Sequence, residues 1–274
     1  MSAISILIPA NNEEGYIGPC LDGLLAQVTT RTAEVIVSAN ACTDATVEIA
    51  RSYGTRFAGK GWRLEVLDSE IGGKPAALNR ADAAATGDIR IYLDADVVMS
   101  PPLLDELAQT LDRPEPTYAS GTLVVSPAES WITRAYGRIW VRLPFMTEGV
   151  PGAGLFAVNA SGRARWEEFP EIISDDTFVR LQFKPDERLL APAPYSWPLV
   201  EGFSSLVRVR RRQDAGVAEL DRLYPGILDR EGKAPLTPGY LTRLGLTDPI
   251  GLAVYITVSL AVRAKRGNDW SRGR

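Results

Sequence analysis

The chain has 274 residues, of which 45% are hydrophobic, and a formal net charge of -4 at pH 7. This composition is that of a globular protein with a sizeable core, and it excludes a largely disordered chain and a general nucleic-acid binder. Histidine is absent. Its absence excludes Ser-His-Asp and Cys-His catalysis and the usual zinc sites, so that acid–base chemistry falls to Asp, Glu, Lys, Tyr or Cys, and a metal would have oxygen ligands.

The two cysteines, Cys20 and Cys42, are too few for a disulfide scaffold and lack metal-ligand spacing. A reduced, cytosolic compartment fits them best. The first residues, MSAISILIPA, pass directly into an apolar run without the charged and hydrophobic regions of a signal peptide. We therefore expect a protein that is not secreted.

Strands and helices alternate over the first hundred residues. Hydrophobic patterning and turn residues predict strands over 4–10, 33–40, 62–68 and 89–96, and helices over 17–27, 44–54 and 74–87. Such alternation implies right-handed crossovers and a parallel sheet that binds its ligand at the carboxyl ends of the strands. The predicted fold class is α/β.

Asp94 and Asp96 stand at the end of the strand predicted over 89–96. Two carboxylates at the carboxyl edge of a parallel sheet are suitable ligands for Mg²⁺ or Mn²⁺ beside a diphosphate. Alternatively, they cap a turn before the Ser-Pro-Pro that follows.

Several short segments occur in an order that resembles the family 2 glycosyltransferases of GT-A fold. They are IPANNEE, SANACTDAT, GGKPAALNRA, LDAD, GAGLFAVNASGRARW and ISDDTFVRL. The resemblance extends from about Ser5 to Arg212. It implies a GT-A fold with a mainly parallel, Rossmann-like sheet flanked by helices, in which 1–100 is the nucleotide-sugar-binding half and 101–212 the acceptor-binding and catalytic half. We expect 213–274 to be a helical C-terminal extension.

On this resemblance, the donor-binding residues are Pro9, Ala10, Glu13, Asn40, Lys74 and Asp94, and the metal ligands are Asp96 and Asp94. Asn40 departs from the family, which commonly has an aspartate there that binds uracil. An amide can still pair with a base edge, but the preference for uridine is weakened. Lys74 is expected near the diphosphate, or alternatively as a solvated cation at a helix start.

The same resemblance makes Asp176 the catalytic base and Asp175 the acid before it. Two adjacent carboxylates repel each other, which raises the pKa of one of them. The alternative interpretation is that Ser174 or Asp175 caps a helix.

Acceptor binding is expected from Glu148, Gly154 and Trp140, although such aromatic residues are more often part of a core. Arg211 is expected at the diphosphate, in a segment loosely similar to the QxxRW of processive relatives. Gln and Trp are missing there, which argues against processive synthesis.

An apolar stretch over 249–262 is shorter than the roughly 20 residues that span a bilayer. Five basic residues follow it, at Arg263, Lys265, Arg266, Arg272 and Arg274. This pattern indicates either an interfacial membrane anchor at the inner face of the cytoplasmic membrane or a core or dimer helix with a basic end. Wholly soluble partitioning of the intact protein would count against the anchor.

The sequence thus favours an inverting, metal-dependent glycosyltransferase in the cytoplasm that uses Mn²⁺ or Mg²⁺. It would transfer one sugar from a nucleotide-sugar donor, with a UDP-sugar favoured, to a carbohydrate or polyprenyl-linked acceptor in cell-surface polysaccharide or glycolipid synthesis. The alternatives are a nucleotidyltransferase acting on sugar phosphates and a non-catalytic nucleotide-sugar-binding module.

Overall fold

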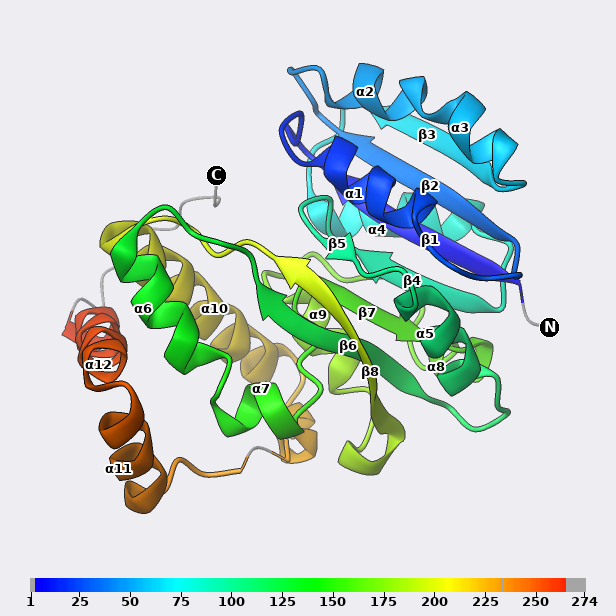
Figure 1. Cartoon of the computed structure of the whole chain (residues 1–274). Coiled ribbons are helices and arrows are strands. Elements are labelled where there is room, and N and C mark those ends of the chain that lie inside the picture. Colours follow the sequence, from blue (N-terminus) through cyan, green and yellow to red (C-terminus); the bar gives the residue numbers. More distant parts are fainter. Residues whose placement is uncertain (1–2, 233, 265–274) are drawn as a thin grey trace.

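The computed structural model describes residues 3–232 and 234–264 (Figure 1). Its strands are β1 (Ile4–Ala10), β2 (Ala33–Asn40), β3 (Arg63–Ser69), β4 (Ile89–Leu93), β5 (Val98–Met99), β6 (Tyr118–Val125), β7 (Leu155–Val158) and β8 (Arg188–Trp197). Its α-helices are α1 (Ile17–Leu25), α2 (Thr46–Ser52), α3 (Gly54–Gly59), α4 (Lys74–Ala84), α5 (Leu103–Leu111), α6 (Trp131–Trp140), α7 (Pro144–Glu148), α8 (Ala160–Arg163), α9 (Asp175–Arg180), α10 (Phe203–Leu223), α11 (Pro238–Thr247) and α12 (Pro249–Ala264). Two 3₁₀ turns, η1 (Pro185–Glu187) and η2 (Ile227–Arg230), complete the described elements.

The described strands form one sheet in the order β3-β2-β1-β4-β7-β6-β8-β5. The first four run parallel, as predicted from the alternating elements. Strand β7 then pairs antiparallel with both β4 and β6, and β8 returns parallel to β6. The sheet is therefore mixed, and β7 joins its parallel half to the rest of the sheet.

Helices cover both faces of the sheet (Figure 1). Side chains alternate along β1, so that Ile6 and Ile8 pack with α1, α2, α3 and α5 on one face. Leu7 points to the other face, where it joins a cluster built from α4, α9 and α10. Every residue of β1 and β2 is buried, which is typical of central parallel strands that are covered on both sides.

A third apolar cluster holds α6, α10, α11 and α12 together. The rings of Tyr136 and Tyr255 stack at 5.4 Å between centroids, and Arg210 Nη1 donates to the Tyr136 hydroxyl at 2.8 Å. These contacts join α6, α10 and α12. They confirm the predicted helical C-terminal extension, which lies beside α6 and away from β1–β3 (Figure 1).

Helix α12 packs only one side against this cluster. Val258 and Val262 are buried, whereas Ile250 and Leu260 are 64% and 58% exposed. Over residues 3–232 and 234–264, no helix is both long and apolar enough to cross a membrane. The basic residues predicted to flank an anchor lie outside the described residues except for Arg263, and contact with a membrane surface stays a prediction.

The segment before β4 must fit closely against the start of β1. Gly87 N–H donates to Ser5 Oγ at 2.8 Å, and a Cβ added at Gly87 would lie 2.7 Å from the Ala3 carbonyl oxygen and 2.8 Å from Ile4 C. These neighbours are backbone atoms, which cannot move without disturbing the pairing of β1.

We expect Gly87→Ala to lower the free energy of unfolding by about 1–3 kcal/mol, because the added methyl overpacks this junction. Urea unfolding measures the change. Gly54→Ala is the matched control, since nothing lies within 4 Å of a Cβ at that helix position, and it should leave stability unchanged or slightly raised. Equal effects of the two substitutions would contradict this account of the junction.

Candidate functional site

The loops that follow β1, β2 and β4 meet at the carboxyl edge of the sheet, because these strands are parallel and adjacent. Asn11 Nδ2 donates to the carbonyl oxygen of Asn40 at 2.6 Å, which joins the loop after β1 to the end of β2. Asp94 directly follows β4, which ends at Leu93 rather than at the predicted residue 96. The two predicted metal ligands therefore lie in the turn beyond the strand.

A cavity opens at this edge between α4, α9 and the loop before β7. Its lining consists of Pro9, Lys74, Leu78, Tyr92, Leu93, Asp94, Gly152, Gly154, Phe156, Asp175 and Asp176. Six of these were predicted site residues, from segments that span residues 9 to 176. The fold thus brings predicted donor, acceptor and catalytic residues together.

Lys74 is the first residue of α4 and links two of the acidic segments. Its Nζ lies 2.8 Å from Asp94 Oδ1 and 3.2 Å from Asp175 Oδ2. Burial alone would lower the pKa of Lys74, but the nearby carboxylates of Asp175, Asp94 and Asp176 outweigh burial and raise it. Lys74 is therefore favoured in its charged form between Asp94 and Asp175.

The two aspartates that begin α9 have different surroundings. Asp175 is 5% exposed, and burial, together with the charges of Asp176 and Asp94, raises its pKa to about 6 despite the opposing effect of Lys74. Asp176 is more exposed, and its Oδ1 accepts from Thr177 N–H at 2.6 Å, which orients the carboxylate. Ser174 occupies the N-cap position without a side-chain hydrogen bond, so neither predicted capping residue caps the helix in this way.

The Asn40 side chain forms hydrogen bonds with backbone groups of two neighbouring segments. The side chain is 3% exposed; its Nδ2 donates to Ala10 O at 2.8 Å, and its Oδ1 accepts from Gly73 N–H at 3.0 Å. It thereby ties the end of β1 to the loop that carries Lys74. Both bonds are structural, and the expected pairing of Asn40 with a base edge stays a prediction.

Asp94 and Asp96 supply the oxygen ligands expected for Mg²⁺ or Mn²⁺. Asp94 lines the cavity, and half-buried Asp96 lies close enough to Cys20 that, after burial, it contributes most to raising the pKa of that thiol. Within the described part of the chain, no group of three His, Cys, Asp or Glu residues could hold an ion. Mg²⁺ is commonly bound by one or two carboxylates together with substrate phosphates, and this donor set fits such an ion.

The remaining donor-side residues lie near the cavity. Ala10 ends β1, and its carbonyl oxygen accepts a hydrogen bond from the Asn40 side-chain amide. Glu13 precedes α1, where its N–H donates to Thr46 Oγ1 at 2.7 Å. This bond joins the loop after β1 to α2, and the predicted contact of Glu13 with a nucleotide stays a prediction.

The predicted acceptor and diphosphate residues are dispersed. Gly154 lines the cavity, whereas Glu148 is exposed at the end of α7. Trp140 is 9% exposed and packs at 5.9 Å between ring centroids against Trp197, so its position matches the core alternative. Arg211 donates from Nη2 to Ala261 O at 2.7 Å, and so binds the end of α12 rather than lining the cavity.

Sequence reasoning did not identify Gly152, Tyr92 and Phe156 as cavity residues. Tyr92 and Phe156 face each other across β4 and β7, with their rings stacked at 4.8 Å, and their pairing depends on an antiparallel strand far along the chain. Gly152 has φ +66°. The Pro-Gly at 151–152 was the one local signal that marked a turn at this position.

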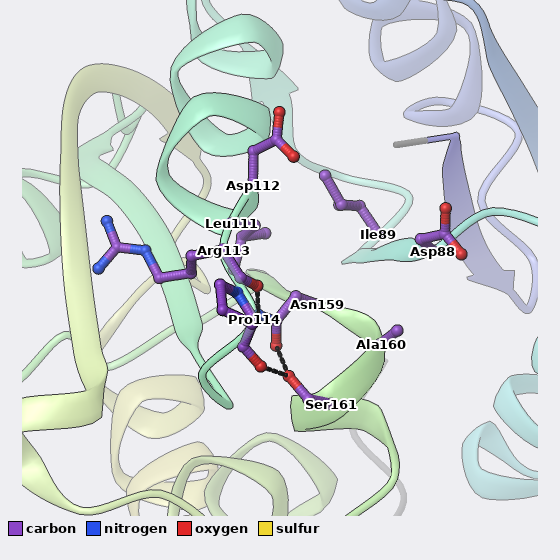
Figure 2. A pocket seen from close by; sticks show the side chains of 9 residues that line it. All are labelled: Asp88, Ile89, Leu111, Asp112, Arg113, Pro114, Asn159, Ala160 and Ser161. Atoms are coloured by element: carbon purple, nitrogen blue, oxygen red, sulfur yellow. Dashed lines mark hydrogen bonds between the residues drawn. The ribbon is translucent and has the colours of Figure 1, made fainter. Parts of the chain in front are cut away.

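A larger hollow lies at the opposite edge of the sheet, beside Ile89 at the start of β4 (Figure 2). Asn159 lines this hollow, and its side chain is hydrogen-bonded to the backbone. Its Nδ2 donates to Arg113 O at 2.8 Å and to Glu115 O at 2.7 Å, while its Oδ1 accepts from Thr117 N–H at 3.0 Å. The polar groups that line this hollow therefore serve the fold. They lie at the start of β4, away from the cavity that contains Asp94, Asp175 and Asp176.

Removal of the Lys74 cation is expected to destabilise the protein increasingly as pH rises. The folded-state pKa of Asp175, about 6, already exceeds its unfolded value, so the contribution of this group to stability falls as pH rises towards 6. Lys74→Met would raise that pKa further and extend the loss above pH 6, to about 1–3 kcal/mol at pH 8. Urea unfolding at pH 5.5 and pH 8 measures this.

The double variant Lys74→Met/Asp175→Asn provides the control. It removes the buried charge that Lys74 neutralises, so it should recover most of the stability lost at pH 8. A loss of the same size at both pH values, or no recovery in the double variant, would show that Lys74 does not act through Asp175.

The sequence model of the family described as "Glycosyl transferase family 2" matches residues 5–165. Over 110 residues the chain is 31% identical to the "Uncharacterized glycosyltransferase EpsJ" of Bacillus subtilis, covering 40% of this chain and 30% of that protein. Over 100 residues it is 34% identical to the glucosyl-3-phosphoglycerate synthase of Mycobacterium tuberculosis, covering 36% and 31%. The chain thus spans about three tenths of the length of these curated relatives.

Solved structures share the fold. The mannosyltransferase PcManGT from Pyrobaculum calidifontis, in complex with GDP-Man and Mn²⁺, superposes with a TM-score of 0.58 at 21% identity, covering 97% of this chain and 76% of that one. S. aureus TarS 1–349, in complex with UDP-GlcNAc, gives a TM-score of 0.54 at 18% identity, covering 95% and 81%. The expected GT-A fold is confirmed, and the family match over more than half of the chain shows that it belongs to glycosyl transferase family 2.

Proposed function

We propose that this chain transfers one sugar from a nucleotide-sugar donor to a hydroxyl of a carbohydrate or lipid-linked acceptor, with inversion and with the help of a divalent ion. The observation that carries the proposal is the Lys74 cluster, in which one cation joins Asp94 of the expected donor side to Asp175 of the expected catalytic side across a single cavity. Membership of glycosyl transferase family 2 supports the same reaction class.

On the donor side, a nucleotide diphosphate would lie over the loops that follow β1, β2 and β4. Lys74 places a positive charge there, and Asp94 and Asp96 would hold Mn²⁺ or Mg²⁺. When bound, the ion would stabilise the negative charge that develops on the diphosphate as the sugar leaves. Neighbouring structures were solved with GDP-Man and Mn²⁺ or with UDP-GlcNAc, and we favour a UDP-sugar for this chain.

On the acceptor side, Asp176 would take the proton of the attacking hydroxyl. It lines the cavity, and its Oδ1 is fixed by Thr177 N–H. Asp175 is buried behind it against Lys74, and would therefore position the helix start and the cation rather than meet the acceptor. Inversion follows when the base and the leaving group lie on opposite faces of the sugar.

The two alternatives are less well supported. A nucleotidyltransferase would normally carry a cation directly after the first strand, where this chain has PANNEEGYIG. A non-catalytic module has no need for an oriented carboxylate such as Asp176 in the same cavity as Lys74 and Asp94.

Asp176→Asn is expected to lower kcat at least about a hundredfold, because an amide cannot accept the acceptor proton. The affinity for UDP should stay within about threefold of the wild type. Turnover with a UDP-sugar and titration calorimetry with UDP measure the two effects. Asp186→Asn, at an exposed carboxylate in η1, is the matched control and should change neither quantity. A fully active Asp176→Asn enzyme would assign the base elsewhere.

Binding of UDP is expected to depend on Mn²⁺ and to lose that dependence in Asp96→Ala. The physical reason is that Asp94 and Asp96 would hold the ion, and the ion would supply positive charge to the diphosphate. Calorimetry with and without Mn²⁺, and with GDP as a comparison, tests this. Asp88→Ala, in the hollow at the opposite edge of the sheet, is the control (Figure 2). Equal UDP affinity with and without Mn²⁺ in the wild type would remove the metal from the proposal.

A further inference from the structure

Arg180 ends α9, one helical turn beyond Asp176, and is 1% exposed. Its Nη2 forms an ion pair with Glu231 Oε2. Among the described residues, its Nε and Nη1 have no hydrogen-bond partner. Buried N–H groups of a charged side chain are costly to leave unpaired, so such groups call for a ligand or another explanation.

The hydroxyl of Tyr118 shares this situation. The side chain is fully buried, and within residues 3–232 and 234–264 its oxygen has no hydrogen-bond partner. A Cβ added at Gly152 would lie 1.8 Å from this oxygen. Because Gly152 lines the same cavity as Asp176, the Tyr118 hydroxyl lies directly behind the cavity wall.

A second buried guanidinium, that of Arg188, lies near Arg180. Arg188 is 6% exposed, and its Nε and Nη1 donate to the backbone carbonyl oxygens of Arg180 at 3.1 Å and Glu231 at 3.0 Å, with the carboxylates of Glu231 and Glu187 also nearby. Burial and the nearby Arg180 lower the pKa of Arg188 to about 10. The unpaired Nε and Nη1 of Arg180 are the groups here that an anion would satisfy.

Residues 144–154, which we call the acceptor flap, cover this region. The Phe145 ring lies 5.1 Å from Arg180 Cζ and is itself half-buried. Val150 has φ +45°, an unfavourable conformation for a β-branched residue, and Gly152 and Gly154 have φ +66° and +73°. Glycine adopts a positive φ without penalty, so the backbone strain of the flap is confined to Val150.

We propose that Arg180 and Tyr118 form a subsite for an anionic group of the acceptor, a phosphate or a carboxylate, which binds when Phe145 moves away from the guanidinium. The subsite rests on the proposed function and specifies its acceptor as an acidic hydroxyl compound. Nε and Nη1 of Arg180 and the Tyr118 hydroxyl donate to the anion. Arg180 and Asp176 lie on the same short helix, with their Cα atoms about 6 Å apart along its axis.

Inorganic phosphate is the probe. The full chain is first saturated with UDP and Mn²⁺, so that the donor side is occupied. Phosphate then replaces chloride at constant ionic strength, and Tm is measured at each phosphate concentration. Phosphate should raise Tm because it binds the folded state. Acetate in a parallel titration distinguishes a carboxylate site from a phosphate site, according to which anion produces the larger shift.

Tyr118→Phe tests the subsite without disturbing the fold, because it removes only a hydroxyl that has no partner. It should weaken phosphate binding about three- to tenfold, the value of one hydrogen bond. Arg180→Gln should abolish binding, and Phe145→Ala should strengthen it by removing the cover. Tyr240→Phe, whose hydroxyl donates to Arg142 O in the C-terminal extension, is the control and should bind phosphate as the wild type does.

Each result has one meaning. Failure of UDP to bind in the wild type overturns the proposed function. Intact UDP binding without a Tm shift from either anion overturns the subsite alone. Wild-type phosphate affinity in Tyr118→Phe overturns it as well, even if Arg180→Gln does not fold, and unchanged or weaker binding in Phe145→Ala overturns the role of the flap.

Discussion

The arrangement of the site depends on one ion-pair network, that of Lys74 with Asp94 and Asp175. Two acidic segments, one with Asp94 and one with Asp175 and Asp176, approach each other there, and without a cation their mutual repulsion would oppose closure of the domain around the cavity. Lys74 can neutralise these carboxylates because of its position. It begins α4 directly after Gly73, and the Gly73 N–H donates to the Asn40 side chain. The charge in the cavity is thus placed by a backbone loop, and that loop is fixed by a buried amide.

The sheet explains why such distant segments meet. Parallel pairing of β1, β2 and β4 directs three loops to one edge, and antiparallel β7 then inserts beside β4 so that the acceptor flap ends at the same edge. Helix α9 covers the other side of the cavity. Each half of the domain contributes carboxylates, and the site is complete only when both halves pack together.

Much of this could be predicted from local patterns. Strands β1 and β2 begin and end where alternating and apolar runs indicated, and Lys74, Asp94 and Asp176 meet as the ordered segments implied. Properties that depend on tertiary packing could not be predicted. Nothing local shows that the Asn40 amide binds two backbone groups, that Trp140 packs on Trp197, or that Arg211 binds the end of α12. The different burial of the adjacent Asp175 and Asp176 likewise depends on tertiary packing.

The bond between Asp94 N–H and Gly154 O, 2.8 Å long, joins the end of the acceptor flap to a residue that also pairs with Lys74. A displacement of the flap at Gly154 is therefore transmitted to the donor side through a single peptide contact. By thermodynamic linkage, if a bound donor changes the affinity for the acceptor by some factor, a bound acceptor changes the affinity for the donor by the same factor. The peptide bond between Gly154 and Leu155 is therefore the point at which the acceptor flap and the loop after β4 are joined most directly.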